Sequence, residues 1–232
     1  MDISKLMFRD GLMEGERILV TGGGTGLGRQ MAEGLAEMGA NLVLSARQKE
    51  RCQEAADVLE NHGIRALARG CDVTVPEDIA GLVDFTMDSF GKIDILVNNA
   101  GTAWGAPAEE MPLEQWNQVI QTNLTGTFLC AQAVARIMIE RQQGKIINIA
   151  SVAAFGGGRP EIMQASGYSA SKGGVVSLTK DLACGWARHN VQVNAIAPGW
   201  FPTHMSGWII ENRKEHILPS IPLGRVGGKD DL

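Results

Sequence analysis

The sequence is poor in aromatic side chains and in cysteine. Aromatic residues make up 5% of the 232 residues, and only one of them is a tyrosine. No two of the four cysteines have the CxxC spacing of a redox or zinc motif: Cys52, Cys71, Cys130 and Cys184. This scatter argues against a disulfide framework and against a zinc knot, and it predicts a protein that works in a reducing cytoplasm.

The sequence also lacks a net positive charge, long apolar runs and metal-ligand motifs. The net charge of −5 and pI near 5.4 leave no basic stripe for a phosphate backbone, so nucleic acid is not an expected partner. No apolar run approaches the roughly 18 residues of a membrane span. The histidines show no HExxH or Cys/His spacing, so no metal site is expected: His62, His189, His204 and His216.

We expect no functional targeting signal at either end of the sequence. Residues 1–17, MDISKLMFRDGLMEGER, are charged throughout and lack the apolar core of a signal peptide. The last four residues, KDDL, resemble an ER-retention tetrapeptide, which has nothing to act on without an entry signal. We therefore expect a cytoplasmic protein with no membrane partner.

Short β-branched runs alternate with longer stretches of helical period. The expected strands are 17–21, 41–45, 64–68, 93–97, 145–150 and 191–197, and the expected helices lie near 26–38, 48–61, 76–90, 112–142 and 169–189. Mostly apolar strands alternating with helices indicate a parallel sheet covered on both faces. The pattern predicts one α/β domain over residues 1–232, with a doubly wound, mainly parallel sheet.

Ligands of such sheets bind beyond the carboxyl ends of the strands, so the residues that follow each strand are the candidates for chemistry. After the first strand comes TGGGTGLG, with Gly22, Gly26 and Gly28 in a GxxxGxG spacing. Missing side chains there let backbone N–H groups approach a pyrophosphate at a helix N-terminus. The alternative is a tight strand-to-helix turn with no ligand.

After the second strand, SARQKE offers Ala46 and Arg47 where NAD sites usually place an acid for the ribose 2′-hydroxyl. A cation in the first turn of a helix opposes the macrodipole, which makes sense if an anion lies beside it. We therefore expect NADP(H) in preference to NAD(H), with Arg47 at the 2′-phosphate and Arg29 as a second contact. The alternative is a solvated surface arginine.

Tyr168, the only tyrosine, lies four residues before Lys172 in GYSASKGG. On a helix this spacing puts both side chains on one face, about 5 to 6 Å apart at Cβ. Other polar or glycine residues follow the remaining strands: Asp72 and Val73 after the third, Asn98 to Gly101 after the fourth, Ser151 after the fifth, and Pro198, Gly199 and Thr203 after the sixth. The asparagines could instead hold turns by bonding local backbone.

Six motifs in this order resemble the short-chain dehydrogenase/reductase family: TGGGTGLG, NNAG, Asn123, Ser151, YSASK and PGWFPT. The resemblance runs from about residue 15 to the end. It implies a Rossmann-type oxidoreductase with Asn123, Ser151, Tyr168 and Lys172 as its catalytic tetrad. The implied cofactor-binding residues are Gly22, Gly26, Leu27, Gly28, Arg47, Asp72, Val73, Asn99, Ala100, Gly101, Tyr168, Lys172, Pro198, Gly199 and Thr203, with Asp72 at the adenine, Asn98 and its neighbours along the cleft, and Thr203 at the nicotinamide end.

Elementary chemistry supports these roles. Reduction of a ketone needs a hydride, which the nicotinamide supplies, and a proton donor to the developing alkoxide, which Tyr168 supplies. We expect Lys172 to stabilise the phenolate and lower its pKa from about 10. Ser151 would hold the substrate oxygen, and Asn123 would support a water path that returns protons. Each residue also has a structural alternative: Ser151 could end a strand, Asn123 could bond backbone, and Lys172 could be an exposed lysine.

Two departures from the family pattern concern the loop before Tyr168 and the C-terminus. Residues 152–167 form a loop a few residues longer than is common, which is expected to place residues 160–163 near the pocket mouth. They either shape specificity there or simply form a surface loop. Family members usually continue through another helix and a seventh strand, which this chain lacks before Leu232. Either the sequence is a truncated product or the fold exists without that edge. The helices near 112–142 and 169–189 resemble the family's pairing face, so we expect a homodimer or homotetramer; the alternative is that they only cover the sheet.

Segment 199–218 has many large apolar side chains and is expected to be a lid over the substrate, with an oligomer interface or membrane contact as the alternative. The predicted substrate residues are Trp104, Ser151, Met163, Trp200, Met205 and Trp208. The resulting hypothesis is an NADP(H)-dependent oxidoreductase acting on a mainly apolar ketone or secondary alcohol, including 3-oxoacyl thioesters. A non-catalytic nucleotide-binding regulator or scaffold with the same fold is the alternative.

Overall fold

The computed structural model describes residues 11–229 and 231–232. Residues 1–10, at which no signal segment is expected, and residue 230, within the KDDL tetrapeptide, lie outside the described residues. The described chain forms a six-stranded sheet, all parallel, in the order β3-β2-β1-β4-β5-β6. The strands are β1 (Arg17–Thr21), β2 (Asn41–Ala46), β3 (Ala66–Gly70), β4 (Ile95–Asn98), β5 (Gly144–Ile149) and β6 (Val191–Ile196).

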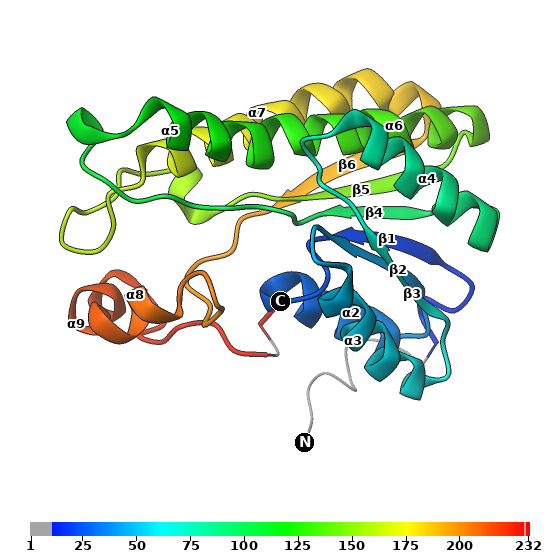
Figure 1. The fold of residues 1–232 in the computed structure, drawn as a ribbon, viewed down its shortest axis with the longest axis horizontal. Coiled ribbons are helices and arrows are strands. Elements are labelled where there is room, and N and C mark those ends of the chain that lie inside the picture. Colours follow the sequence, from blue (N-terminus) through cyan, green and yellow to red (C-terminus); the bar gives the residue numbers. More distant parts are fainter. Residues whose placement is uncertain (1–10, 230) are drawn as a thin grey trace.

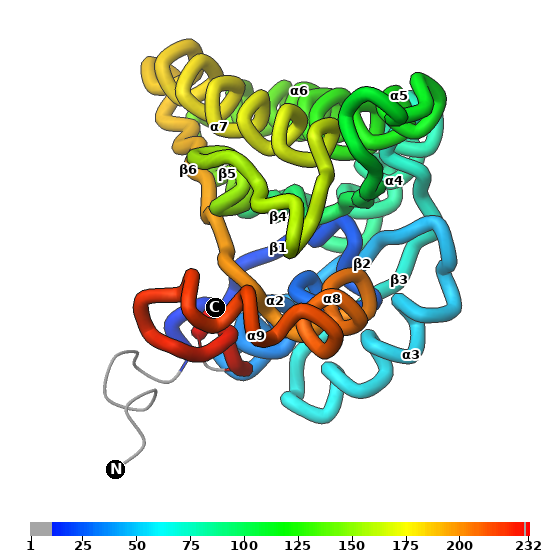
Figure 2. Tube along the Cα trace, turned by 90° about the vertical axis from the view of Figure 1, so that its left-hand side faces the viewer, coloured from blue at the N-terminus to red at the C-terminus, as the bar shows by residue number. Residues whose placement is uncertain are grey.

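Two helical layers cover the sheet, which confirms the doubly wound fold. The helices are α2 (Gly26–Glu37), α3 (Lys49–Leu59), α4 (Pro76–Phe90), α5 (Leu113–Ile120), α6 (Gly126–Arg141), α7 (Ser166–Trp186), α8 (Gly207–Asn212) and α9 (Lys214–Ile217). Helices α2 and α3 lie on one face, and α4 to α7 lie on the other (Figure 1). The view at 90° shows the same two layers, with α8 and α9 on the α2 side beyond the sheet (Figure 2). Among the described residues, no helix combines the length and apolarity needed to cross a membrane.

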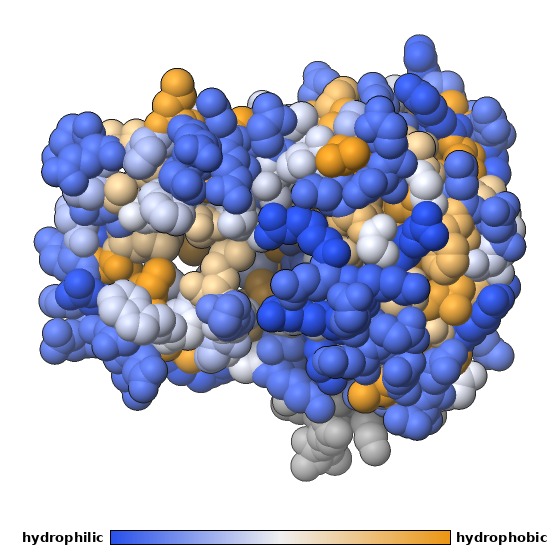
Figure 3. All heavy atoms as spheres, in the orientation of Figure 1, coloured by the Kyte–Doolittle hydropathy of each residue, from blue (hydrophilic) through white to orange (hydrophobic). Residues whose placement is uncertain are grey.

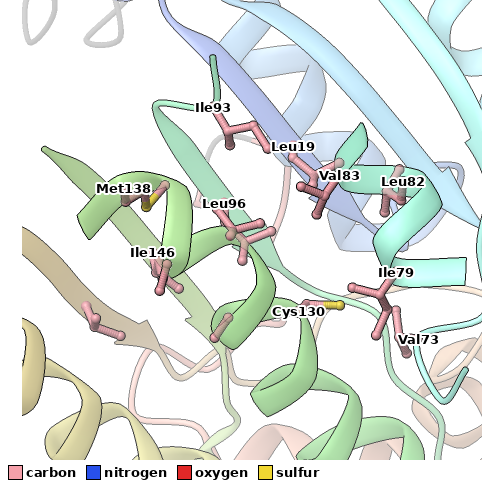
Figure 4. Close-up of a cluster of buried hydrophobic side chains, with 14 of the residues drawn as sticks. Leu19, Val73, Ile79, Leu82, Val83, Ile93, Leu96, Cys130, Met138 and Ile146 are labelled. Carbon is pink, nitrogen blue, oxygen red and sulfur yellow. The ribbon is translucent and has the colours of Figure 1, made fainter. Parts of the chain in front are cut away.

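Each face of the sheet has its own apolar core. One core joins β-strand residues such as Leu19 and Leu96 to α4 and α6 side chains such as Leu82 and Met138 (Figure 4). The other packs Ile18 and Leu42 against α2 and α3. Successive strand residues point to opposite faces, which is why neighbours such as Ile18 and Leu19 serve different cores. Burial on both faces explains the continuous apolar runs of the strands.

The amino ends of the strands are tied together by a buried carboxylate, far along the strands from the site. Asp94 accepts hydrogen bonds from the Arg17 N–H (2.9 Å) and from Lys92 (2.8 Å) and Arg141 (2.9 Å). Burial alone would raise the pKa of Asp94, but the bonds from Lys92 and Arg141 outweigh it and hold the pKa below its usual value. This network fixes β1, β4 and the end of α6 relative to one another.

The boundaries expected from the sequence differ from the structure at several places. The long helix expected over 112–142 is divided into α5, a π-helical turn (Gln121–Thr125) and α6. Strand β3 begins at Ala66, two residues later than expected. In the described part of the chain no strand follows β6, whose side chains from Asn194 to Ile196 are exposed. The sheet therefore has β6 as an open edge here, as the missing seventh strand implies.

Candidate active site

A cavity of about 1140 Å³ opens at the carboxyl edge of the sheet. The space-filling view shows this face hollowed between the α5–α7 layer and the α8–α9 segment, with apolar side chains gathered around the hollow (Figure 3). The cavity is lined by residues that follow all six strands, including Gly22, Arg47, Asp72, Asn99, Ser151 and Pro198. Because parallel strands end at the same edge, segments far apart in sequence meet in one site.

The glycine-rich loop forms one wall of the cavity. Gly22 and Gly26 have φ of +67° and +56°, a left-handed backbone that glycine adopts without strain. Both line the cavity together with Leu27. Gly28 lies behind the wall, where a Cβ atom would overlap the Gly22 carbonyl and the Asn99 side-chain amide. The GxxxGxG spacing therefore provides two left-handed turns and one close approach of α2 to the loop.

Asn98, the last residue of β4, and Asn99, which follows it, point to opposite faces. Asn99 donates from its side-chain amide to the carbonyls of Thr21 (3.1 Å) and Gly22 (3.0 Å), and so ties the end of β4 to the glycine loop. Asn99, Ala100 and Gly101 line the cavity as predicted. Asn98, expected along the cleft, lies buried on the other face, where its amide donates to the Asn148 side-chain oxygen (3.0 Å). The expectation for Asn98 is wrong because strand residues alternate between faces.

The end of the cavity after β2 is cationic. Arg47 and Arg51 both line it, with Gln48 between them, and neither forms an ion pair with a described acid. Arg29, expected as the second contact, instead pairs with Glu33 (3.0 Å) and is not part of the lining. Sequence reasoning missed Arg51, which lies in the first turn of α3, whereas Arg47 precedes that helix.

A buried hydroxyl completes this end of the cavity. The Ser45 side chain is 1% exposed, lies in the lining, and its oxygen has no hydrogen-bond partner among the described residues. Buried polar atoms are normally paired, so this hydroxyl in the cavity wall is available to bond a polar group of a ligand. An anionic group such as a phosphate fits this donor set.

The residues after β3 form the next wall. The Asp72 carboxylate accepts from the Thr74 N–H (2.9 Å) and hydroxyl (2.7 Å), which fixes the turn in which Asp72, Val73 and Thr74 line the cavity. Cys71 also lines the cavity, but burial raises its pKa to about 12. A thiol with that pKa stays neutral at physiological pH and is no candidate nucleophile.

Three of the four predicted catalytic residues meet in the cavity. Tyr168 and Lys172 come from the first two turns of α7, and Ser151 lies two residues after the end of β5. The Lys172 ammonium donates to the Ile149 carbonyl (2.6 Å) and lies 5.7 Å from the centre of the Tyr168 ring. The Ser151 hydroxyl accepts from the Ala153 N–H (3.2 Å). A phenol, a hydroxyl and an ammonium thus share one site at the sheet edge.

Asn123 lies behind this group. Its side-chain oxygen accepts from the Thr102 N–H (2.8 Å), and its amide donates to the Thr102 carbonyl (2.9 Å) and to the Ser171 hydroxyl (3.0 Å). Asn123 is 0% exposed and is not part of the cavity lining. It belongs to the π-helical turn, a distortion that is frequent at functional sites. Its side chain therefore holds protein segments in place, and both polar atoms are occupied by that task.

Burial sets the protonation of the Tyr168–Lys172 pair. Burial raises the pKa of Tyr168 above its usual value, and a hydrogen bond with Ser151 opposes that change. The expected lowering of the phenol pKa is therefore wrong for this site, because desolvation of the phenolate is the larger effect. Burial also lowers the pKa of Lys172 to about 8. At neutral pH the site holds a protonated phenol beside a protonated amine.

The predicted substrate residues divide into two groups. Ser151 and Met205 line the cavity, whereas Trp104, Met163, Trp200 and Trp208 do not. Trp104 and Trp208 are 45% and 67% exposed. The lining instead includes polar residues that sequence reasoning missed: Thr102, Gln118, Gln121, Thr122 and His204. Most of these lie on α5 and the π-helical turn, where no motif identifies them.

Segment 199–218 forms α8 and α9 and lies beside the glycine loop. The Thr203 side chain, Pro198 and Gly199 line the cavity, and a Cβ atom on Gly26 would lie 3.4 Å from Thr203. Phe201 is buried, and the Trp200 carbonyl accepts from the Gly227 N–H (2.8 Å). The segment is thus anchored at Trp200 and Phe201, while Met205 and Trp208 are exposed beyond the anchor. Among the described residues, no group of three or more His, Cys, Asp or Glu side chains gathers as metal ligands.

A doubly wound sheet that carries a glycine loop and a Ser–Tyr–Lys group at its carboxyl edge defines a class of nucleotide-dependent oxidoreductases. A family model described as short chain dehydrogenase matches residues 16–214. The chain belongs to the short-chain dehydrogenase/reductase family and is an oxidoreductase.

Three known proteins illustrate the relationship. The 5-keto-D-gluconate 5-reductase of Escherichia coli (strain K12) is 42% identical over 222 residues, which are 95% of this chain and 86% of that protein. The 3-oxoacyl-[acyl-carrier-protein] reductase of Synechocystis is 39% identical over 92% of this chain and 84% of its own. The structure of a short-chain type dehydrogenase/reductase from Mycobacterium marinum matches with a TM-score of 0.90 and 38% identity, covering 95% of this chain and 86% of that one.

The buried Lys172 predicts a pH dependence of stability. Its pKa is about 8 in the folded protein and 10.5 for a free lysine, so the unfolded chain binds more protons between these values. The free energy of unfolding should therefore rise with pH, by up to about 1.4 kcal/mol per pH unit. Denaturant unfolding of the wild type and of Lys172→Met between pH 7 and 10 measures the difference, which we expect to be level below pH 8 and to grow above it.

The exposed Lys180, on the same helix, supplies the control for this experiment. Lys180→Met should follow the wild-type pH dependence throughout. A wild-type minus Lys172→Met difference that stays constant from pH 8 to 10 would contradict a desolvated amine at this position.

Proposed function

We propose that this protein is an NADP(H)-dependent ketone reductase, acting also as a secondary-alcohol dehydrogenase in reverse, with Tyr168 as the general acid/base. The observation that carries the proposal is the convergence of Ser151, Tyr168 and Lys172 in the cavity that the glycine loop borders. The membership of an oxidoreductase family favours this function over the regulatory or scaffold alternative.

The raised pKa of Tyr168 suits the direction of ketone reduction. A phenol that stays protonated at neutral pH can donate its proton to an oxygen on which negative charge develops. The Lys172 ammonium, held by the Ile149 carbonyl, offsets the charge of the phenolate that remains. The Ser151 hydroxyl orients the substrate oxygen toward the phenol. Asn123 holds the surrounding turns in place. We also propose that a water path that returns protons to the site passes beside it.

The wall residues fit a nicotinamide dinucleotide. Enzymes of this family use NAD(P). The glycine loop and Leu27 would hold the pyrophosphate, Asp72 and Val73 the adenine end, and Asn99 to Gly101 with Pro198, Gly199 and Thr203 the remainder of the dinucleotide. When bound, the nicotinamide supplies the hydride. Arg47 and Arg51 would bind a 2′-phosphate, with the unpaired Ser45 hydroxyl within the same wall.

We propose a ketone as the substrate, because relatives named for a 5-keto sugar acid and for a 3-oxoacyl thioester share that group. The polar lining and the single lining methionine of segment 199–218 favour a substrate with hydrogen-bonding groups over a purely apolar ketone. A panel of 5-keto-D-gluconate, an acetoacetyl thioester and cyclohexanone with NADPH separates these classes. Turnover of cyclohexanone alone would contradict the polar preference.

We also propose a lid for the site, an oligomeric state and a cellular location. Segment 199–218 would act as the lid, because it is anchored at Phe201 beside the cavity and exposes Met205 and Trp208; slower proteolysis of this segment with NADPH and substrate tests the idea. Helices α5 to α7 would pair two copies into a homodimer or homotetramer, and a monomer in sedimentation at micromolar protein would oppose that. A cytoplasmic location completes the proposal.

Tyr168→Phe tests the catalytic assignment. Removal of the phenol oxygen should lower kcat about 10²- to 10⁴-fold, which is the usual contribution of general acid catalysis. The dissociation constant of NADPH, measured by quenching of tryptophan fluorescence, should stay within about two-fold of the wild-type value. Retention of wild-type turnover by this variant would remove Tyr168 from the mechanism.

Arg47→Ala and Arg51→Ala test the cofactor preference. Each variant should raise KM for NADPH about 10- to 100-fold, because a hydrogen bond to a charged group contributes roughly 1.5 to 3 kcal/mol. KM for NADH should change less than about two-fold, since NADH lacks the 2′-phosphate. Arg29→Ala, at the arginine paired with Glu33, is the matched control and should resemble wild type. Equal effects on both cofactors, or a wild type that prefers NADH, would overturn the assignment.

A further inference from the structure

We propose that Ser171 is a positioning residue that sets the location of Tyr168, the proposed acid/base on which this inference rests. Ser171 is 0% exposed and does not line the cavity. Its hydroxyl donates to the Tyr168 carbonyl (2.7 Å) and accepts from the Asn123 side-chain amide (3.0 Å). One hydroxyl thus joins the backbone of the residue that carries the phenol to the π-helical turn.

The turn that carries Tyr168 has no side-chain cap. Tyr168 is the third residue of α7, and the N-cap residue Ala165 provides no side-chain hydrogen bond to the first turn. Uncapped helix ends leave backbone groups without intrahelical partners and tend to fray. Ser171 lies one turn further into the helix, and its hydrogen bond to the Tyr168 carbonyl restrains the first turn. It therefore restrains the backbone at the point where the phenol begins.

The restraint is transmitted from a rigid neighbour. The Asn123 side chain is already bonded to both the N–H and the carbonyl of Thr102, so its position is fixed by the segment that follows β4. Ser171 extends that clamp to α7. A chain of hydrogen bonds therefore runs from Thr102 through Asn123 and Ser171 to Tyr168, and it joins three segments of the site. Proton transfer needs its donor and acceptor at hydrogen-bond distance. A less restrained Tyr168 turn would therefore slow proton transfer, although Ser171 itself does not touch the substrate.

The same helix offers a matched control. Thr179 is buried, its hydroxyl accepts from the Asn148 side-chain amide (3.0 Å), and it donates to the Val175 carbonyl (2.7 Å). This arrangement repeats that of Ser171, with an asparagine on one side and an α7 carbonyl on the other, about three turns away from Tyr168. Removal of either hydroxyl leaves a buried amide without its partner. Only the removal at Ser171 releases the turn that carries the phenol.

The experiment compares Ser171→Ala with Thr179→Val in the full chain, with NADPH and the panel ketone of highest kcat/KM. We expect Ser171→Ala to lower kcat about 10- to 100-fold and to leave KM for NADPH within about two-fold, because misplacement of a reacting group acts on the chemical step. The solvent deuterium isotope effect on kcat should increase, since proton transfer becomes slower. Thr179→Val should lose a similar amount of stability against denaturant but keep kcat within about two-fold.

A kcat for Ser171→Ala that matches that of Thr179→Val at equal stability would overturn the proposal and leave Ser171 a structural residue. Ser171→Cys keeps the volume with weaker hydrogen bonds, and it serves if the alanine variant does not fold. The kcat of Ser171→Cys should be lower than that of wild type by less than ten-fold. A kcat and a solvent isotope effect equal to those of wild type would overturn the proposal. Turnover retained in Tyr168→Phe would instead refute the proposed function, so the two failures are distinguishable.

Discussion

The hydrogen bond between the Lys172 ammonium and the Ile149 carbonyl is the contact on which the site depends. It joins α7 to the end of β5 and holds a buried amine at the carboxyl edge of the sheet. Ser151 follows β5 two residues later, and Tyr168 lies one turn before Lys172, so this contact brings all three side chains together. Burial then sets their chemistry, because it favours the neutral forms of both the phenol and the amine.

Much of the fold and of the site follows from local sequence. The strand runs are apolar throughout because both faces are buried, and the residues after each strand meet because the strands are parallel. These two facts place Gly22, Asp72, Asn99 and Ser151 around one cavity, and the i, i+4 spacing places Tyr168 and Lys172 on one face of α7. The family resemblance adds the tetrad, of which Asn123 lies behind the wall rather than in it.

Other features depend on three-dimensional packing that no local pattern carries. Asn98 lies on the far face because strand side chains alternate, whereas the NNAG motif suggests that its residues act together. The π-helical turn at Asn123 interrupts a pattern that reads as one continuous helix. The apolar residues expected around the substrate are mostly absent from the lining, since anchoring of segment 199–218 at Phe201 leaves Trp208 exposed. The pKa of Tyr168 is raised rather than lowered as expected from the sequence, because the desolvation of a side chain cannot be judged from sequence.

Ultraviolet titration of the lone tyrosine tests the account most directly, because Tyr168 is the only phenol in the chain and the five tryptophans do not ionise in that range. The folded protein without nucleotide is compared with the same sample in denaturant, where the phenol should titrate near 10. A midpoint in the folded protein above that of the unfolded chain is the predicted result, since burial keeps Tyr168 protonated as a proton donor. A folded midpoint well below the unfolded one would contradict a desolvated phenol and point to a phenolate at the site.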